Sequence, residues 1–130
     1  MKKLIYLLVI TIIFAACASK KDYIVTGSIE GGVEGGIVYL SFVEKGSFVN
    51  IDSSVIKNGV FTFKGRQDTV VNCYVRSKEK VGNTNRKLYG DFFLENGEIN
   101  IIITTKGSTV SGTPNNDAYQ AIRNEMYELQ

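Results

Sequence analysis

The chain has 130 residues and contains no His and no Trp, with only one Pro and two Cys. Without His, neither Ser-His-Asp nor Cys-His catalysis, imidazole metal ligation or a histidine pH switch is available. No Cys pair or Asp-rich loop has metal-ligand spacing, so we expect no metal and no other cofactor. The net charge of +2 gives no electrostatic indication of nucleic-acid binding. The length fits one domain.

Apolar residues and the net positive charge are concentrated in the first 16 residues, MKKLIYLLVITIIFAA. Two Lys precede an apolar core at residues 4–14, and two Ala lead to Cys17, which is the pattern of a secretory signal. As a helix the 11-residue core rises about 16 Å, roughly half of a ~30 Å hydrocarbon layer, so a spanning anchor is the weaker interpretation. The two Lys account for the whole net charge of +2, so residues 17–130 are balanced.

Phe14-Ala15-Ala16-Cys17 resembles a bacterial lipobox, in which the Cys is lipidated and becomes the mature N-terminus. Phe14 departs from the usual Leu, and ordinary cleavage near Ala16 with a free Cys17 thiol is the alternative. Because each buried CH₂ contributes ~0.8 kcal/mol, acyl chains such as palmitate hold a protein on a membrane without a spanning helix. The sequence therefore predicts a signal at 1–16, a tether at 17–22, and an envelope lipoprotein facing the periplasm or the outer-membrane surface.

The second cysteine, Cys73, is predicted to be a core residue. Strand alternation places it on one face with Val71 and Val75, and Asn72 and Tyr74 on the other. Free Cys is commonly buried as a small apolar residue, so we favour this interpretation over a reactive thiol.

From residue 23 to 113 the sequence alternates short apolar strands with turn signals, about every ten residues. Predicted strands cover residues 23–29, 37–43, 48–57, 60–64, 70–77, 88–95, 99–104 and 109–111. So many short strands predict an all-β fold, an antiparallel β-sandwich of about seven or eight strands. No βαβ pattern is present, so neither a Rossmann-like nor a thioredoxin-like core is expected.

Two Asn-Gly pairs are the strongest turn signals. Asn58-Gly59 predicts a type I′ hairpin turn, with Phe61 and Phe63 facing the core. Asn96-Gly97 predicts a second hairpin, whose tip would be flanked by Glu95 and Glu98. A hairpin tip offers no cleft in which two carboxylates could act on a glycosidic bond, so we expect Glu95 and Glu98 to contribute to solubility instead.

Residues 114–130 change to a helical period and predict a C-terminal amphipathic helix. Asn115 or Asn116 is the expected N-cap, with Asp117 in the first turn. A possible docking stripe follows at spacings of 3, 4 and 3: Tyr119, Ile122, Met126 and Leu129. No Gly or basic stop signal follows, so either a frayed natural end or a connector to a downstream domain fits.

Two surface features are further candidates. The segment 76–87 carries a local charge of +4 and is a candidate patch for anionic surfaces: Arg76, Lys78, Lys80, Arg86 and Lys87, opposed by Glu79. A solvated loop that keeps edge strands soluble is the alternative. Exposed tyrosines such as Tyr39, Tyr74 or Tyr89 are candidates for holding a glycan or a peptide, unless they are partly buried strand residues.

Five stretches in order, at residues 23–29, 36–40, 51–65, 92–99 and 110–117, resemble the all-β N-terminal domain of unknown function 4369 of Bacteroidota envelope lipoproteins. The resemblance covers about residues 23–120. It implies a non-catalytic front module that often stands before a thioredoxin-like, peroxiredoxin-type domain carrying a Cys-x-x-Cys. This chain has no Cys-x-x-Cys, so no catalytic residue is carried over.

The leading hypothesis is an exported, lipid-anchored, non-catalytic β-domain that positions or docks a neighbouring thioredoxin-like domain or envelope partner. One alternative is the N-terminal part of a periplasmic thiol-disulfide oxidoreductase whose catalytic domain lies beyond residue 130. A glycan- or peptide-binding module is the other alternative.

Overall fold

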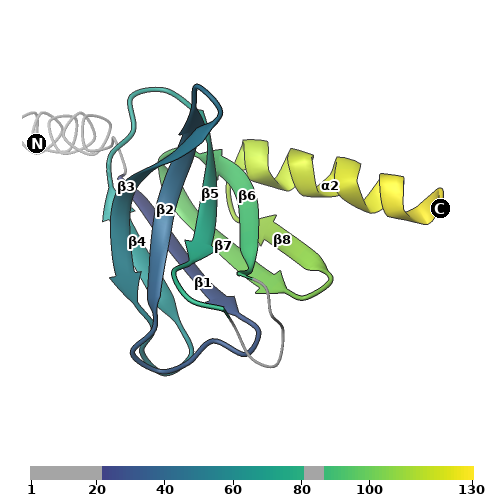
Figure 1. The fold of residues 1–130 in the computed structure, drawn as a ribbon. Coiled ribbons are helices and arrows are strands. Elements are labelled where there is room, and N and C mark those ends of the chain that lie inside the picture. The colour runs from purple at the N-terminus through teal and green to yellow at the C-terminus, as the bar shows by residue number, and fades with distance from the viewer. Residues whose placement is uncertain (1–21, 81–86) are drawn as a thin grey trace, which may run out of the picture.

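The fold is a β-sandwich with one C-terminal helix, seen in a computed structural model that describes residues 22–80 and 87–130 (Figure 1). One sheet has the strand order β4-β1-β7-β8 and the other β3-β2-β5-β6. The elements are β1 (Tyr23–Ile29), β2 (Ile37–Glu44), β3 (Ser47–Val55), β4 (Phe61–Gly65), β5 (Val71–Ser77), β6 (Tyr89–Leu94), β7 (Gly97–Thr104), β8 (Gly107–Ser111) and α2 (Pro114–Glu128). The predicted all-β sandwich is confirmed, and its pairs are antiparallel as expected except for the parallel pair of β1 with β7.

Period-2 alternation builds the core between the two sheets. In every strand except β3, which has no buried residue, the inward positions are buried, and they include Phe61 and Phe63 from β4, Cys73 and Val75 from β5, and Phe92 from β6. The predictions that both phenylalanines and Cys73 face the core are therefore confirmed. Aromatic and branched aliphatic side chains supply most of the buried area, which is the main stabilising contribution to such a domain.

The first Asn-Gly pair forms the predicted tight turn, with φ of +54° at Asn58 and +76° at Gly59. The two backbone N–H groups of this turn donate to the Glu34 carboxylate at 2.9 and 3.3 Å. Pairing across the turn stops at a single bridge between Lys57 and Val60, because β3 and β4 join different sheets. The turn is confirmed, and it passes the chain from one sheet to the other.

The second Asn-Gly pair does not close a hairpin, so that prediction is wrong. Strand β6 lies in one sheet and β7 in the other, where β7 pairs with β8 and runs parallel to β1. Glu95 and Glu98 therefore do not flank a hairpin tip. The physical reason is that an Asn-Gly turn reverses the chain locally, whereas the partners of the next strand are chosen by long-range packing.

Helix α2 closes the side of the sandwich where β6 and β8 are the edge strands (Figure 1). It contacts both of these strands, and its C-terminal end projects away from the sheets (Figure 1). Over residues 22–80 and 87–130, no helix combines the length and the apolar character that crossing a bilayer requires.

Candidate functional site

The start of α2 differs from the sequence prediction. Pro114 is the first helical residue and Thr113 is the N-cap, so the prediction of Asn115 or Asn116 as N-cap is wrong. Pro suits this position because its fixed φ is helical and its missing N–H needs no partner there. The Thr113 side chain caps no helical N–H.

The cap comes instead from Glu95, at the end of β6. Its carboxylate accepts the backbone N–H of Asn115 at 3.0 Å and the Asn115 side-chain N–H at 2.6 Å. Burial raises the pKa of the Glu95 carboxyl, but hydrogen bonds from Thr113 and Asn115 outweigh it, so the pKa lies below its ordinary value. A carboxylate also interacts favourably with the positive end of the helix. Glu95 therefore joins the sheet to α2.

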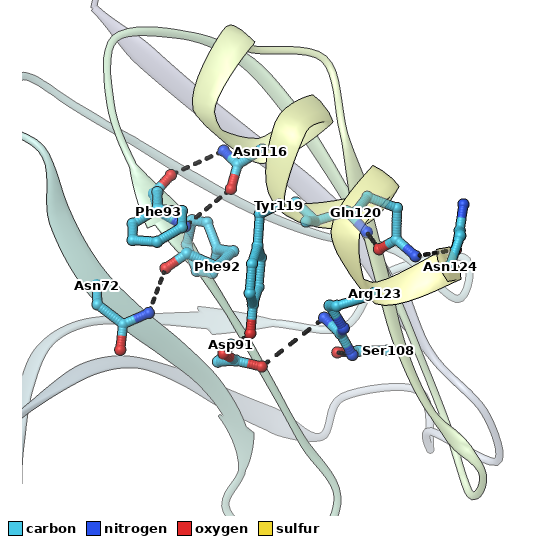
Figure 2. A network of polar contacts seen from close by, with 11 residues as sticks. Asn72, Asp91, Phe92, Phe93, Ser108, Asn116, Tyr119, Gln120, Arg123 and Asn124 are labelled. Carbon is cyan, nitrogen blue, oxygen red and sulfur yellow. Dashed lines mark hydrogen bonds and ion pairs between the residues drawn. The ribbon is translucent and has the colours of Figure 1, made fainter. Parts of the chain in front are cut away.

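Asn116 is fully buried and occupies the position of a missing strand partner for β6 (Figure 2). Its side-chain oxygen accepts the Phe93 N–H at 2.8 Å, and its side-chain nitrogen donates to the Phe93 carbonyl and to Thr113 Oγ1, both at 2.8 Å. One amide thus satisfies both backbone groups of an edge residue, as a neighbouring strand would.

Gln120 binds the edge strand of the other sheet in a similar way. Its side-chain oxygen accepts the N–H of Val110 in β8 at 3.0 Å, and its side-chain nitrogen donates to Asn124 at 2.9 Å. The helix therefore bonds to the edge strand of each sheet, through Asn116 on β6 and Gln120 on β8. This arrangement fixes α2 to both halves of the sandwich.

Tyr119 and Arg123 complete the contact at Asp91 of β6 (Figure 2). The Tyr119 hydroxyl donates to Asp91 Oδ2 at 2.5 Å, and its ring meets Phe93 edge-on at 5.3 Å between centroids. Arg123 Nη1 lies 3.8 Å from Asp91 Oδ1, and Nη2 donates to Ser108 of β8 at 3.4 Å. Burial and the bond to Asp91 raise the pKa of Tyr119. The phenol is thus a neutral donor that holds the helix.

The four residues of the proposed docking stripe divide into two groups. Tyr119 packs against the core cluster, whereas Ile122, Met126 and Leu129 are 58%, 59% and 88% exposed. Tyr127 is also exposed beside them. Whether these apolar side chains bind a partner stays a prediction. The structure shows that α2 presents them to solvent while its other face holds the sandwich.

A second candidate surface is the outer face of the sheet β3-β2-β5-β6. The rings of Phe48, Tyr74 and Tyr89 form a cluster here, called the outer aromatic cluster, with centroid distances of 5.3 Å between the first two and 6.4 Å between the last two. Arg76 lies over the Phe48 ring at 4.1 Å. Two of the three candidate tyrosines, Tyr74 and Tyr89, belong to this cluster. The third, Tyr39, is half-buried on β2 and stands opposite Arg76 in the β2–β5 register.

The predicted basic patch is only partly described. Lys78, Lys80 and Lys87 are exposed, whereas Arg76 is held on the sheet face by Ser41 and Asn50. Arg86 and Cys17, the predicted lipidation site, lie outside the described residues. The Cys73 thiol is buried and unbonded, and burial raises its pKa to about 11. Between residues 22–80 and 87–130, no group of three or more potential Cys or carboxylate ligands gathers around a common point.

A family model described as a domain of unknown function (DUF4369) matches residues 23–119. The chain belongs to this family. The match runs from the first residue of β1 to Tyr119, so it includes the sandwich and the first part of α2 with Asn116. No curated protein and no solved structure matches the chain.

Sequence reasoning missed Glu95, Asn116, Gln120 and Arg123 as the residues that attach α2. A signal was present, because Asn116, Tyr119, Gln120 and Arg123 follow the spacing i, i+3, i+4, i+7 of one helix face. Only one of the four, Tyr119, is apolar or aromatic, so a search for apolar periodicity does not detect this face. The side chains bind main-chain groups of edge strands, which a sequence pattern does not display.

Proposed function

We propose that this chain is an exported, lipid-anchored β-domain that performs no chemistry itself and positions a neighbouring domain or envelope partner through α2. The observation that carries the proposal is the division of α2 into two faces. One face is fixed to both sheets by Asn116, Gln120 and Arg123. The other exposes Ile122 and Met126, which the sandwich does not cover.

The attachment of α2 supports a positioning role. A helix joined to one sheet alone would move with that sheet's edge, whereas α2 bonds to β6 and β8 together. A partner held on its exposed side would have a fixed orientation relative to the sandwich. Exposed apolar side chains at helical spacing are the usual anchors of helix-mediated docking.

The carboxylates near α2 are bonded to the helix, which supports a structural role for them rather than a catalytic one. Asp91 accepts from Tyr119 and is paired with Arg123, and Glu95 accepts from Asn115. Each carboxylate is thus engaged in holding the helix. A general acid or base needs a proton-transferring atom directed at a substrate, and these carboxylates are directed at α2 instead.

The anchor is proposed at Cys17, on the lipobox-like residues that precede it. Radiolabelled palmitate is expected to enter the wild-type protein and not a Cys17→Ala variant, and the variant is expected to leave the membrane fraction. Equal labelling of the two proteins, or unchanged membrane association, would contradict the anchor.

Docking is tested by a photo-crosslinking amino acid placed at Met126 in intact cells, with Asn124 as the matched control. Asn124 lies two residues earlier on the same exposed helix, and its side chain bonds to Gln120. We expect one discrete crosslinked product from position 126 and much less from 124. Equal, diffuse crosslinking from both positions would show that the apolar side of α2 has no defined partner.

The proposed partner is a thioredoxin-like domain or another envelope protein of a bacterium of the Bacteroidota type. If the gene product is itself a thiol-disulfide oxidoreductase, its coding sequence continues past residue 130 into a βαβ segment with a Cys-x-x-Cys. A stop codon after Gln130 would exclude the oxidoreductase hypothesis and leave a separate envelope protein as the proposed partner.

A further inference from the structure

The outer aromatic cluster forms the wall of an open depression, on the opposite side of β5 from the core. Its volume is about 460 Å³, and Phe48, Tyr74, Arg76, Lys87 and Tyr89 line it, together with Ser77 and Leu88. Phe48 is 46% exposed and Tyr89 is 62% exposed. Single exposed apolar side chains are ordinary, whereas contiguous exposed patches are typical of interaction surfaces.

Among the residues that the structure describes, the hydrogen-bond partners that orient Arg76 are neutral, and none of them compensates its positive charge. Its Nε donates to Ser41 Oγ at 3.3 Å, and Nη2 donates to Asn50 Oδ1 at 2.9 Å. The Phe48 ring supports the guanidinium from one side at 4.1 Å. These contacts fix the geometry of the group in advance, which lowers the entropy lost when it binds a ligand.

The depression carries positive charge without a carboxylate in its lining. Arg76 and Lys87 line it, and neither forms an ion pair with any residue among 22–80 and 87–130. Asp91 stands opposite Tyr74 in the β5–β6 register, but it is engaged by Tyr119 and Arg123. A ligand that complements this site therefore carries a negative charge beside a flat, weakly polar ring.

The geometry points to a binding site for an acidic saccharide on the outer face of β3-β2-β5-β6. The saccharide's carboxylate lies near Arg76 and Lys87, and the C–H face of its ring packs on Tyr74 and Tyr89. Guanidinium groups bind carboxylates strongly because their N–H groups match the two oxygens. Sugar hydroxyl groups find donors and acceptors in the tyrosine hydroxyls at the same surface.

An extended peptide fits this surface less well. Strand addition requires a free strand edge, but β5 is flanked by β2 and β6. On β6, both main-chain groups of Phe93 are already bonded to Asn116. Over β5 and at Phe93, recognition therefore relies on ring faces and cations, and the edge at β3 is the remaining place where a strand could add. The site is separate from α2 and does not depend on the docking proposed above.

The binding test uses the folded protein and a panel of uronic-acid, sialylated and sulfated oligosaccharides, led by oligogalacturonate. A neutral glucose oligomer of equal length, inorganic phosphate and vesicles with anionic lipids are the comparison probes. Side-chain NMR shifts of Tyr74, Tyr89 and Arg76 Nε report binding. We expect saturable shifts with an acidic oligosaccharide, and binding about tenfold weaker or absent with the neutral oligomer and with phosphate.

Matched variants locate the site. Tyr89→Ala is expected to weaken binding about tenfold, whereas Tyr127→Ala, which removes an equally exposed tyrosine (62%) from α2, leaves it unchanged. Lys87→Gln is expected to weaken binding, with Lys64→Gln on β4 as the control. Equal losses in the paired variants would overturn the proposal. So would the absence of saturable shifts with every acidic oligosaccharide, or equal responses to phosphate or vesicles.

Discussion

The Asn116 side chain is the most sensitive point in the attachment of α2. In Asn116→Ala, three hydrogen bonds disappear, and the Phe93 N–H, the Phe93 carbonyl and Thr113 Oγ1 lose a partner. An unsatisfied buried polar group costs about 1–3 kcal/mol, and a half-buried residue such as Phe93 recovers part of this from water. We therefore expect the free energy of unfolding to fall by about 2–4 kcal/mol.

Urea and thermal unfolding followed by far-UV circular dichroism measure this loss. For a domain of about 100 residues, 1 kcal/mol corresponds to roughly 4–8 °C, so Tm should fall by about 10 °C or more. Asn124→Ala is the matched control, because it removes an exposed helical Asn with one side-chain contact. That variant should stay within about 0.5 kcal/mol of the wild type.

Asn116→Asp separates hydrogen bonding from packing, because the two side chains have nearly the same shape. The aspartate still accepts the Phe93 N–H, but its second oxygen faces the Phe93 carbonyl, where Asn116 donates. We expect this variant to be destabilised at pH 7 and to recover as acid protonates the carboxyl group. An Asn116→Ala protein as stable as the Asn124→Ala control, with unchanged exchange of the Phe93 amide, would show that these hydrogen bonds do not stabilise the attachment of α2.

Three further predictions concern other parts of the fold. Because the folded-state pKa of Glu95 is lowered, its stabilising effect is present above the ordinary Glu pKa of 4.5 and is lost as pH falls through the folded-state value. In urea unfolding across pH 3–7, the free energy of unfolding should therefore fall less with decreasing pH in Glu95→Gln than in the wild type or in the exposed control Glu98→Gln. The same dependence of the free energy of unfolding on pH in all three proteins would contradict this. The thiol of Cys73, with its pKa raised to about 11 by burial, should resist iodoacetamide at pH 8 until denaturant is added, as mass spectrometry would detect. Gly112→Ala should lower Tm much more than Gly46→Ala. Both glycines have positive φ, but only at Gly112 would the new methyl group collide with the Glu98 carbonyl. Equal losses of Tm would count against the close approach of Gly112 to Glu98.

Local features of the fold were predictable because they depend on neighbouring residues. The alternation around Cys73 and the pairing of Phe61 with Phe63 on one face follow from strand geometry alone. The positive φ values at Asn58-Gly59 follow from the conformational preference of that pair. In each case the sequence within about ten residues determines the outcome.

The choice of strand partners was not predictable in the same way. Asn96-Gly97 carries a hairpin signal, yet β7 pairs with β1 from the start of the domain, in register from Tyr23 opposite Gly97 to Ile29 opposite Ile103. That parallel pairing buries β7 at the centre of its sheet. It is determined by packing between segments about seventy residues apart, which local turn chemistry does not report.

The attachment of α2 lies between these cases. Its helical period and the exposed positions Ile122 and Met126 follow from spacing. The attaching face does not, because Asn116 and Gln120 are read as polar surface residues until the edge strands that they complete are known. For the same reason the sequence alone places Glu95 at a hairpin tip. Its helix-capping role appears only when β6 and α2 are placed together.

We propose that α2 is fixed to the sandwich by the face that carries Asn116, Gln120 and Arg123, and that its other face, with Ile122 and Met126, and its last turns are open to a partner. Hydrogen exchange measured by mass spectrometry on the purified chain and on the protein extracted with its native membrane tests this directly. We expect strong amide protection from residue 116 to 123 in both samples. From 124 to 129 we expect weak protection in the purified chain and stronger protection in the membrane extract. Uniformly fast exchange along α2 in the purified chain, or no gain at 124–129 in the extract, would contradict the proposal.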